Sequence, residues 1–398
     1  EMQYVASEMQ KDDHFRVRKI PLLIGGATTS RVHTAVKIAP HYEGPVVYVP
    51  DASRSVSVAQ GLLSTQAAAY IAEVNADYER VRQQHANKKQ VPLWPLAKAR
   101  ANKWLPTPVR PELVEGLKAS TGSARTALAW SGFTPTVPRF IGRRVFRNVD
   151  LADLARYIDW GPFFQTWDLA GPFPEILKDE VVGEEARRVF SDGKRMLQRL
   201  IDGRWLTANA VVGLYPANQV GDDDIALYAD ESRERPVLVW HGLRQQAEKQ
   251  EVDGAMRPSR CLADFVAPKG VANDYVGVFA VTAGVGVEKK EKQFLDDHDD
   301  YSAILFKALA DRLAEALAEQ MHHRVRTDLW GYAPHEALSN EDLIAEKYQG
   351  IRPAPGYPAC PDHSVKRGLF DLLQASDIGM GLTESLAMTP AASVSGFY

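Results

Sequence analysis

The chain has 398 residues, with 47 Lys and Arg against 51 Asp and Glu, a formal net charge of -4, and 45% hydrophobic residues. This charge balance gives no strong field for a polyanion and argues against nucleic acid as the main partner. No apolar run approaches the roughly 18 residues that a membrane helix needs. Two cysteines cannot build a disulfide framework, and EMQYVASEMQ has no apolar core of a secretory signal. We therefore expect a soluble, cytoplasmic protein without a membrane partner.

Both ends of the sequence interrupt a regular pattern. Residues 2–9 have helical spacing with no capping residue before them, and residues 392–398 alternate like a strand and stop in mid-pattern. We expect the chain to be a segment of a longer protein.

Residues 1–75 predict parallel strands covered by helices. An apolar run at 20–24 leads into Gly25-Gly26-Ala27-Thr28-Thr29-Ser30 and a helical stretch, and a second run at 46–49 leads into Pro50-Asp51-Ala52-Ser53 and another helix. Loops at the carboxyl ends of such strands form a crevice beside free helix N–H groups. The glycines and hydroxyls suit a ligand there, but a tight turn with a Ser or Thr cap explains them equally well. Neither a GxGxxG nor a P-loop pattern is present, which disfavours the common nucleotide sites.

Residues 76–149 predict a linker. A polar helical stretch gives way to an irregular, proline-bearing segment that contains Ala119-Ser120-Thr121-Gly122-Ser123. This composition is typical of a connector with an inserted stretch rather than of a core.

Residues 150–398 predict a second domain with strands at 211–215, 225–228, 237–240 and 275–281. Asp222-Asp223-Asp224 indicates a hydrophilic hairpin loop rather than a metal site. Asp159 stands in an aromatic-rich segment, as either a surface aspartate beside a core cluster or the carboxylate of an aromatic-walled pocket for an ammonium or sulfonium group.

The most regular helix is predicted at residues 299–326. Its leucines and one methionine recur every fourth position as an apolar stripe. Asp311 and Glu315 lie four apart on another face, and Glu319 and His322 continue it. A solvated face is the usual explanation of such a pattern.

Four prolines stiffen residues 352–361 and leave few backbone donors. The N–H groups of Ala354, Gly356 and Tyr357 could be held ready for a ligand. Arg352 adds a planar cation that can clamp a carboxylate. A plain proline-rich connector remains the alternative.

Together these motifs resemble one family. The segments at 25–30 and 49–53 resemble the C-terminal part of the cobalamin-binding domain of cobalamin-dependent methionine synthases. Four further segments are similar to the reactivation domain of that family: Tyr157-Ile158-Asp159-Trp160, Asp311-Arg312-Leu313-Ala314-Glu315, Gly331-Tyr332-Ala333-Pro334 and residues 352–361. The resemblance covers nearly the whole chain apart from an insert near residues 105–127.

The resemblance implies a fold and a function. Residues 1–75 would end a Rossmann-like α/β domain with a parallel sheet, and residues 150–398 would form an α+β activation domain with a mainly antiparallel sheet. The family's methyltransferase moves methyl from methyltetrahydrofolate through cobalamin (as methylcobalamin) to homocysteine. When the cobalamin oxidises, the activation domain remethylates it with S-adenosylmethionine and an electron from a flavodoxin-type donor.

The resemblance also implies residue roles. Gly25, Gly26 and Ala52 match residues that line the cobalamin tail, and Thr28 lies in the same loop. Asp159 matches a residue that binds the amino group of S-adenosylmethionine. The other cofactor-binding residues that it implies are Asp311, Glu315, Arg352, Ala354, Gly356 and Tyr357.

Some family parts match nothing in this sequence. They are the Asp-x-His-x-x-Gly segment with the cobalt-ligating histidine, the zinc-bearing homocysteine domain and the folate domain. The resemblance therefore implies no catalytic or metal-ligating residue here, and it makes the parent protein's own homocysteine, folate and cap domains partners. A non-catalytic regulatory module that binds S-adenosylmethionine or cobalamin remains open. A free-standing nucleotide-binding oxidoreductase has only the loop at 25–30 in its favour.

Overall fold

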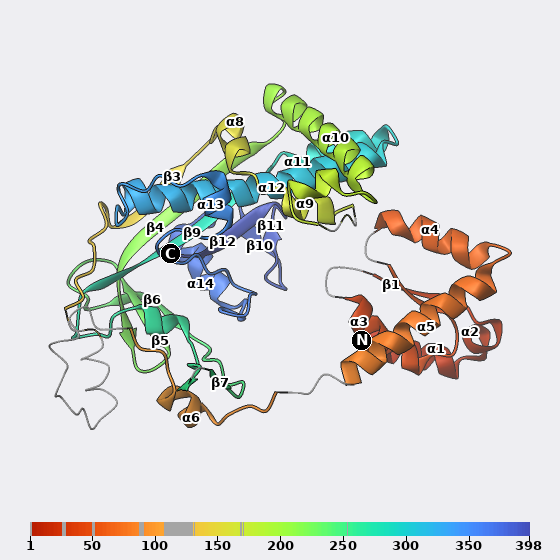
Figure 1. Cartoon of the computed structure of the whole chain (residues 1–398), viewed down its shortest axis with the longest axis horizontal. Helices are drawn as coiled ribbons and strands as arrows, with labels where there is room; N and C mark the ends of the chain where they lie inside the picture. The colour runs from red at the N-terminus through yellow and green to blue at the C-terminus, as the bar shows by residue number, and fades with distance from the viewer. Residues whose placement is uncertain are drawn as a thin grey trace. The chain divides into compact units, whose positions relative to one another are not determined.

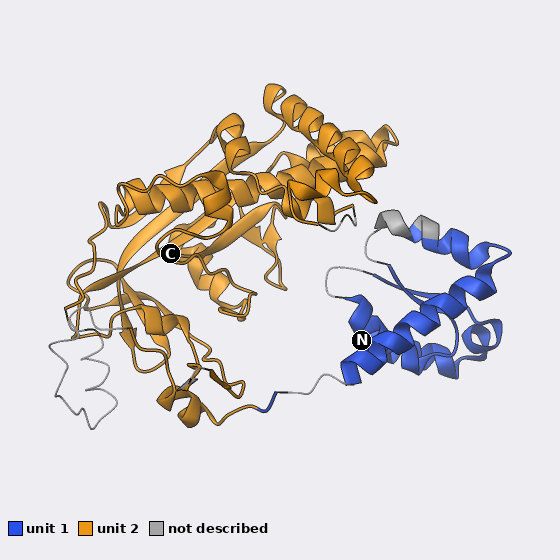
Figure 2. Cartoon of the chain, in the orientation of Figure 1, with its two compact units in different colours: residues 1–92 blue, residues 93–398 orange. Residues whose placement is uncertain are grey.

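The computed structural model describes residues 2–25, 29–49, 52–86, 91–106, 130, 132–167, 169, 171–252 and 254–398. The chain divides into two compact units, residues 1–92 and residues 93–398 (Figure 2). This boundary falls inside the predicted linker of residues 76–149. Helix α5, Ala67–Ala86, belongs to unit 1, whereas strand β3, Gly142–Phe146, belongs to the sheet of unit 2.

Unit 1 contains two parallel strands flanked by helices. Strand β1, Leu22–Gly25, pairs with β2, Val46–Val49, and Gly25 lies opposite Val49. The predicted parallel pairing is therefore confirmed, although the sheet comprises only these two strands within the described residues. The helical segments are α1 Met2–Lys11, α2 Asp13–Arg18, α3 Arg31–His33 with a π-helical turn Thr34–Ile38, α4 Ala52–Leu63 and α5.

Helices cover both faces of this small sheet. Val46 packs in a cluster with Ala6 of α1 and Ile38, whereas Val47 packs with Val58 of α4. Because successive side chains of a strand point to opposite faces, a strand buried on both sides reads as an unbroken apolar run. That is why Val46–Val49 was predictable as a buried strand.

Unit 2 is built on a six-stranded antiparallel sheet with the order β12-β9-β4-β5-β6, and β3 also pairs with β4. The prediction of a mainly antiparallel sheet is confirmed. The four strands predicted between residues 211 and 281 and the strand-like segment at 392–398 all lie in this sheet. The strands are β4 Thr207–Val220, β5 Asp224–Tyr228, β6 Pro236–His241, β9 Asp274–Val285 and β12 Ser393–Phe397. Two short hairpins stand apart from it, β7 Glu251–Val252 with β8 Ala255–Met256, and β10 Gly381–Leu382 with β11 Met388–Thr389.

Helices lie on both sides of the central strands β4 and β9 (Figure 1). On one side Val212 and Phe279 pack with the long helices α10, Gly183–Asp202, and α12, Asp300–Arg324. On the other side Val211 packs with α14, Val365–Leu373. Within the described residues the other α-helices of unit 2 are α6 Leu96–Ala101, α8 Leu151–Leu154, α9 Gly161–Gln165, α11 Val287–Asp296 and α13 Asn340–Ile344.

Helix α12 matches its predicted extent and stripe. Asp299 caps the N-terminus by accepting a hydrogen bond from the N–H of Ser302. The predicted stripe is fully buried against the sheet: Leu305, Leu309, Leu313, Leu317 and Met321. The apolar face of this helix thus forms a large part of one core cluster of unit 2.

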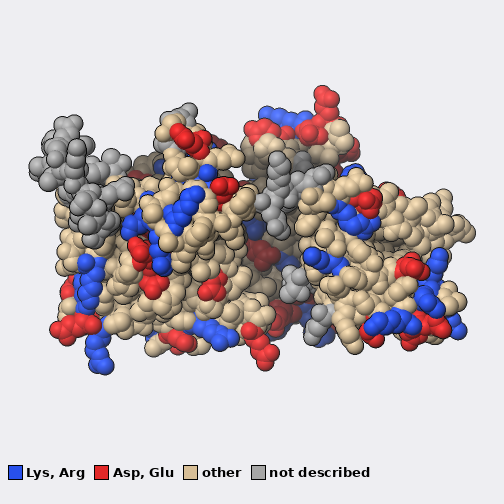
Figure 3. Space-filling view, turned by 90° about the horizontal axis from the view of Figure 1, so that it is seen from below, with Lys and Arg blue, Asp and Glu red and all other residues tan. Residues whose placement is uncertain are grey.

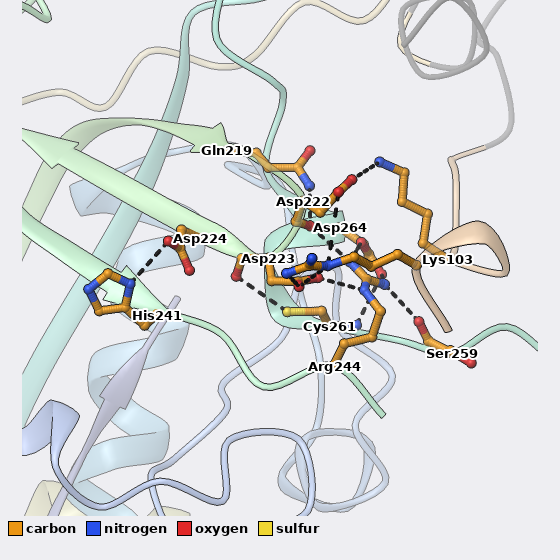
Figure 4. A network of polar contacts seen from close by, with 11 residues as sticks. Lys103, Gln219, Asp222, Asp223, Asp224, His241, Arg244, Ser259, Cys261 and Asp264 are labelled. Carbon is orange, nitrogen blue, oxygen red and sulfur yellow. Dashed lines mark hydrogen bonds and ion pairs between the residues drawn. The ribbon is translucent and has the colours of Figure 1, made fainter. Parts of the chain in front are cut away.

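A buried ionic network fastens residues 93–106 to the rest of unit 2 (Figure 4). The guanidinium of Arg244 donates to both carboxylate oxygens of Asp264, at 2.7 and 2.8 Å, and from Nε to Asp223 at 2.6 Å. Asp223 also accepts a hydrogen bond from Arg100 of α6 at 2.7 Å. The predicted hairpin loop is confirmed, because Val220 pairs with Asp224 at its base. The expected exposure is wrong for Asp223, because the pairing with Arg244 allows this carboxylate to be buried.

Within the described ranges, no helix is both long and apolar enough to cross a membrane. On the face shown in Figure 3, acidic and basic side chains are interspersed, as the near-neutral charge leads one to expect.

Candidate functional site

The proline-rich loop at residues 352–361 is fastened to the sheet of unit 2. The carbonyl of Pro353 accepts a hydrogen bond from the N–H of Phe397 in β12 at 3.0 Å. A Cβ on Gly396 would lie 2.4 Å from that carbonyl oxygen, so glycine is required for this close approach. Cys360 near the other end of the loop is buried in the core cluster that contains α14. The loop is therefore held by bonding and burial as well as by its prolines.

The backbone donors of this loop differ in their availability. The N–H of Gly356 donates to the carbonyl of Cys360 at 2.8 Å, and the N–H of Cys360 donates back to Tyr357 at 2.9 Å. The expectation of a free Gly356 donor is thus wrong, because the residues between 356 and 360 form a closed turn with Gly356 at a φ of 100°. The N–H groups of Ala354 and Tyr357 have no partner within the described residues, and the Tyr357 side chain is exposed.

Arg352 stands at the start of the loop and lies partly exposed in a cavity of about 390 Å³. Tyr348, Pro353 and Ala359 also line this cavity. Arg352 donates from Nη2 to Oε2 of Glu319 on α12 at 2.8 Å. Arg352, at the start of this loop, is therefore ion-paired with a glutamate of the long helix α12.

Glu319 and His322 do not continue a solvated face. Both are buried, because Arg352, Tyr348 and Tyr398 cover the C-terminal part of α12. Burial raises the pKa of Glu319, although Arg352 and Arg326 oppose the shift. The prediction of a solvated face is therefore wrong for these two residues.

His322 is enclosed by aromatic rings. It stacks on Tyr398 at a centroid distance of 5.1 Å and meets the edge of Tyr348 at 4.7 Å. Burial and the neighbouring Arg326 and Arg352 lower its pKa to about 2, so the ring is neutral. Neither ring nitrogen has a hydrogen-bond partner in the part of the chain that the structure describes.

A second arginine lies next to Glu319 and Tyr348. Arg326 is fully buried and forms a forked ion pair with Glu336, with N–O distances of 2.7, 2.8 and 3.0 Å. Its guanidinium also lies 4.3 Å from the ring centroid of Tyr348 and 3.9 Å from Oε1 of Glu319. Two arginines and two glutamates therefore lie close together at the end of α12, and Glu319 is the one that α12 itself contributes.

Asp159 lies just before helix α9 at the edge of an aromatic cluster. Its Oδ1 accepts a hydrogen bond from the N–H of Gly161 at 2.9 Å, and the side chain is partly exposed. Trp160 packs edge-on against Phe163, which is fully buried. Most of the aromatic segment is therefore core, and Trp160 remains the partly exposed ring next to the carboxylate.

The segments that carry Asp159 and Arg352 meet the same side of α12. The hydroxyl of Tyr157 lies 3.3 Å from Nδ1 of His323, and Arg352 bonds to Glu319. Glu319 and His323 are four residues apart and so share one helix face. No direct contact between Asp159 and Arg352 occurs in the described residues, and Asp159 does not line the cavity of Arg352.

Asp311 and Glu315 stand apart from this group. Both are exposed near the middle of α12, as the helical spacing indicated. The structure does not bring them into the cavity beside Arg352.

In unit 1, the parallel pairing places the end of β1 at Gly25 beside the end of β2 at Val49. A Cβ on Gly25 would lie 2.9 Å from the carbonyl oxygen of Val49, so close strand packing accounts for this glycine. Helix α4 begins at Ala52, just past the same edge. Gly26 and Thr28 lie outside the described residues, as does the side chain of Ala52.

Sequence reasoning missed Arg326 and Glu336 altogether. A signal was available, since Arg326 ends the predicted helix and Glu336 follows ten residues later beyond Gly331-Tyr332-Ala333-Pro334. An arginine and an acid on either side of a tight turn can meet, but the pattern alone does not show that both are buried.

Unit 2 is thus an α+β domain in which a basic, proline-stiffened loop is bonded to a long core helix. Residues 150–398 match the family model described as vitamin B12 dependent methionine synthase, activation domain. The chain belongs to this family. A solved structure described as the MetH reactivation domain bound to AdoHcy is 48% identical, with a TM-score of 0.67, and the match covers 77% of this chain and 86% of that one.

Proposed function

We propose that unit 2 binds S-adenosylmethionine and its product S-adenosylhomocysteine (AdoHcy), and that it serves the reductive methylation of cobalamin within a methionine synthase. One observation carries the proposal: a reactivation domain that is 48% identical to this chain is described as bound to AdoHcy. The resemblance in sequence and fold is close enough to expect the same ligand here.

The headgroup of this ligand carries an ammonium and a carboxylate, which require opposite partners. Arg352 is a partly exposed guanidinium beside a cavity, and its planar fork suits a carboxylate. Asp159 offers a partly exposed carboxylate beside Trp160, which suits an ammonium. The N–H groups of Ala354 and Tyr357, which have no partner among the described residues, can donate to the remaining polar atoms of the ligand.

The edge of unit 1 at Gly25 and Ala52 is proposed to contact the nucleotide tail of cobalamin. Cobalamin, when bound, supplies a cobalt that accepts the methyl group. S-adenosylmethionine loses that methyl from its sulfonium and leaves as AdoHcy, and one electron comes from an external donor, for which we propose a flavodoxin-type protein. Methyl transfer from methyltetrahydrofolate to homocysteine would belong to further domains of the parent enzyme, where a zinc ion would be held.

Calorimetric titration of the whole chain with AdoHcy tests the ligand assignment. Arg352→Ala and Asp159→Asn should each weaken binding by roughly 10- to 100-fold, because each leaves a charged ligand group without its partner. Arg367→Ala, which removes an exposed arginine of α14, is the matched control and should bind as the unmodified chain does. Unchanged affinity in both site variants would reject these residue roles, and no binding to the unmodified chain would reject the proposed function.

A further inference from the structure

We infer that Glu319 is a positioning residue, which orients the guanidinium of Arg352 for the carboxylate of the ligand. This inference rests on the function proposed above and adds a residue to it. Glu319 itself is buried and is not expected to touch the ligand.

The contact between the two residues joins a movable side chain to a fixed one. An arginine side chain has many rotamers, so an unanchored Arg352 would lose much conformational freedom on binding. Glu319 projects from the well-packed part of α12, between the buried residues Leu317 and Met321. Its Oε2 accepts from Nη2 of Arg352 at 2.8 Å, which fixes one edge of the guanidinium plane.

The other edge of the Arg352 guanidinium remains unpaired. Nη1 of Arg352 has no hydrogen-bond partner among the described residues, although it is buried. A guanidinium has five N–H donors, and the bond to Glu319 uses one of them. An anchored guanidinium can therefore still bind a carboxylate, at a lower entropic cost than a mobile one.

The alternative is that Glu319 serves only as a counterion for the neighbouring arginines. The geometry argues against this alternative. Arg326 already has its own forked partner in Glu336, and its distance to Glu319 is 3.9 Å. The short contact of Glu319 is the one with Arg352. A negative charge next to Arg352 weakens its attraction for an anion, so a counterion role predicts tighter carboxylate binding when Glu319 is removed. A positioning role predicts the reverse.

The experiment compares two ligands by calorimetry on the whole chain. AdoHcy carries the amino-acid headgroup, whereas 5′-methylthioadenosine lacks it. Glu319→Ala should weaken AdoHcy binding by roughly tenfold or more and leave methylthioadenosine binding within about twofold. Glu319→Gln keeps an oxygen acceptor in the same place and should restore most of the affinity. Equal losses for both ligands would show a general structural effect and overturn the inference, as would unchanged or tighter AdoHcy binding.

Two controls make the test specific. Glu336→Gln alters a buried glutamate of the same cluster that pairs with Arg326, and it should leave the ratio of the two affinities unchanged. In an Arg352→Ala background, Glu319→Ala should cause no further loss of AdoHcy affinity, because Glu319 acts only through Arg352. A further loss there would overturn the inference. Absence of AdoHcy binding by the unmodified chain would instead reject the proposed function.

Discussion

Removal of the Arg244 guanidinium should strongly destabilise unit 2. Arg244→Met keeps much of the apolar stem but removes the five hydrogen bonds that the guanidinium donates. The Asp264 side chain is 0% exposed and that of Asp223 is 7% exposed. Both carboxylates would then be left in the interior without their main counter-charge.

The expected magnitude follows from this burial. Removing one partner of a buried ion pair costs roughly 3–5 kcal/mol, whereas an exposed pair contributes about 0–1 kcal/mol. Arg100 pairs with the same Asp223 but its side chain is 41% exposed, so Arg100→Met should cost less than about 1 kcal/mol. Adding Asp264→Asn to Arg244→Met should recover part of the loss, because an amide carries no charge to be compensated.

Urea unfolding followed by tryptophan fluorescence measures this cost. All eight tryptophans of the chain lie in residues 93–398, so the signal reports on unit 2 alone. The midpoint should fall sharply for Arg244→Met and little for Arg100→Met. A free energy of unfolding for Arg244→Met within about 1 kcal/mol of the unmodified chain would refute the role given to the network.

Two other changes test the region around the proline-rich loop. Gly396→Ala would place a Cβ 2.4 Å from the carbonyl oxygen of Pro353. It should therefore lower the free energy of urea unfolding by roughly 1–3 kcal/mol and also weaken AdoHcy binding. Unchanged values in both assays would contradict the role given to this close approach. His322→Phe should make unit 2 less sensitive to acid. The pKa of His322 is lowered to about 2, so the unfolded chain binds the extra proton below about pH 6.5 and stability is lost as the pH falls. This residue should account for about 2 kcal/mol of the fall in unfolding free energy between about pH 7 and pH 5, and an identical fall in the variant would disprove its contribution.

The strands and the long helix were predictable because their signals are local. An apolar run such as 211–215 indicates a strand that is buried on both faces. The stripe from Leu305 to Met321 indicates a helix that is buried on one face. Arg352 was also predictable as a candidate, since a lone cation in a stiff loop is unusual. The bond between Gly356 and Cys360 was not, because a turn closure depends on backbone angles that proline spacing does not determine.

The acidic residues that were misjudged share one physical cause. Asp223 and Glu319 each stand in a charged stretch that local spacing assigns to solvent, and each is buried by an arginine from elsewhere in the chain, Arg244 or Arg352. A carboxylate can leave water only when a counter-charge and hydrogen bonds replace its hydration. Because the chain fold places the arginine, a helical wheel cannot distinguish Glu315, which stays exposed, from Glu319, one turn later. Their difference lies in the segments that cover the end of α12, among which Arg352 of the proline-rich loop pairs with Glu319.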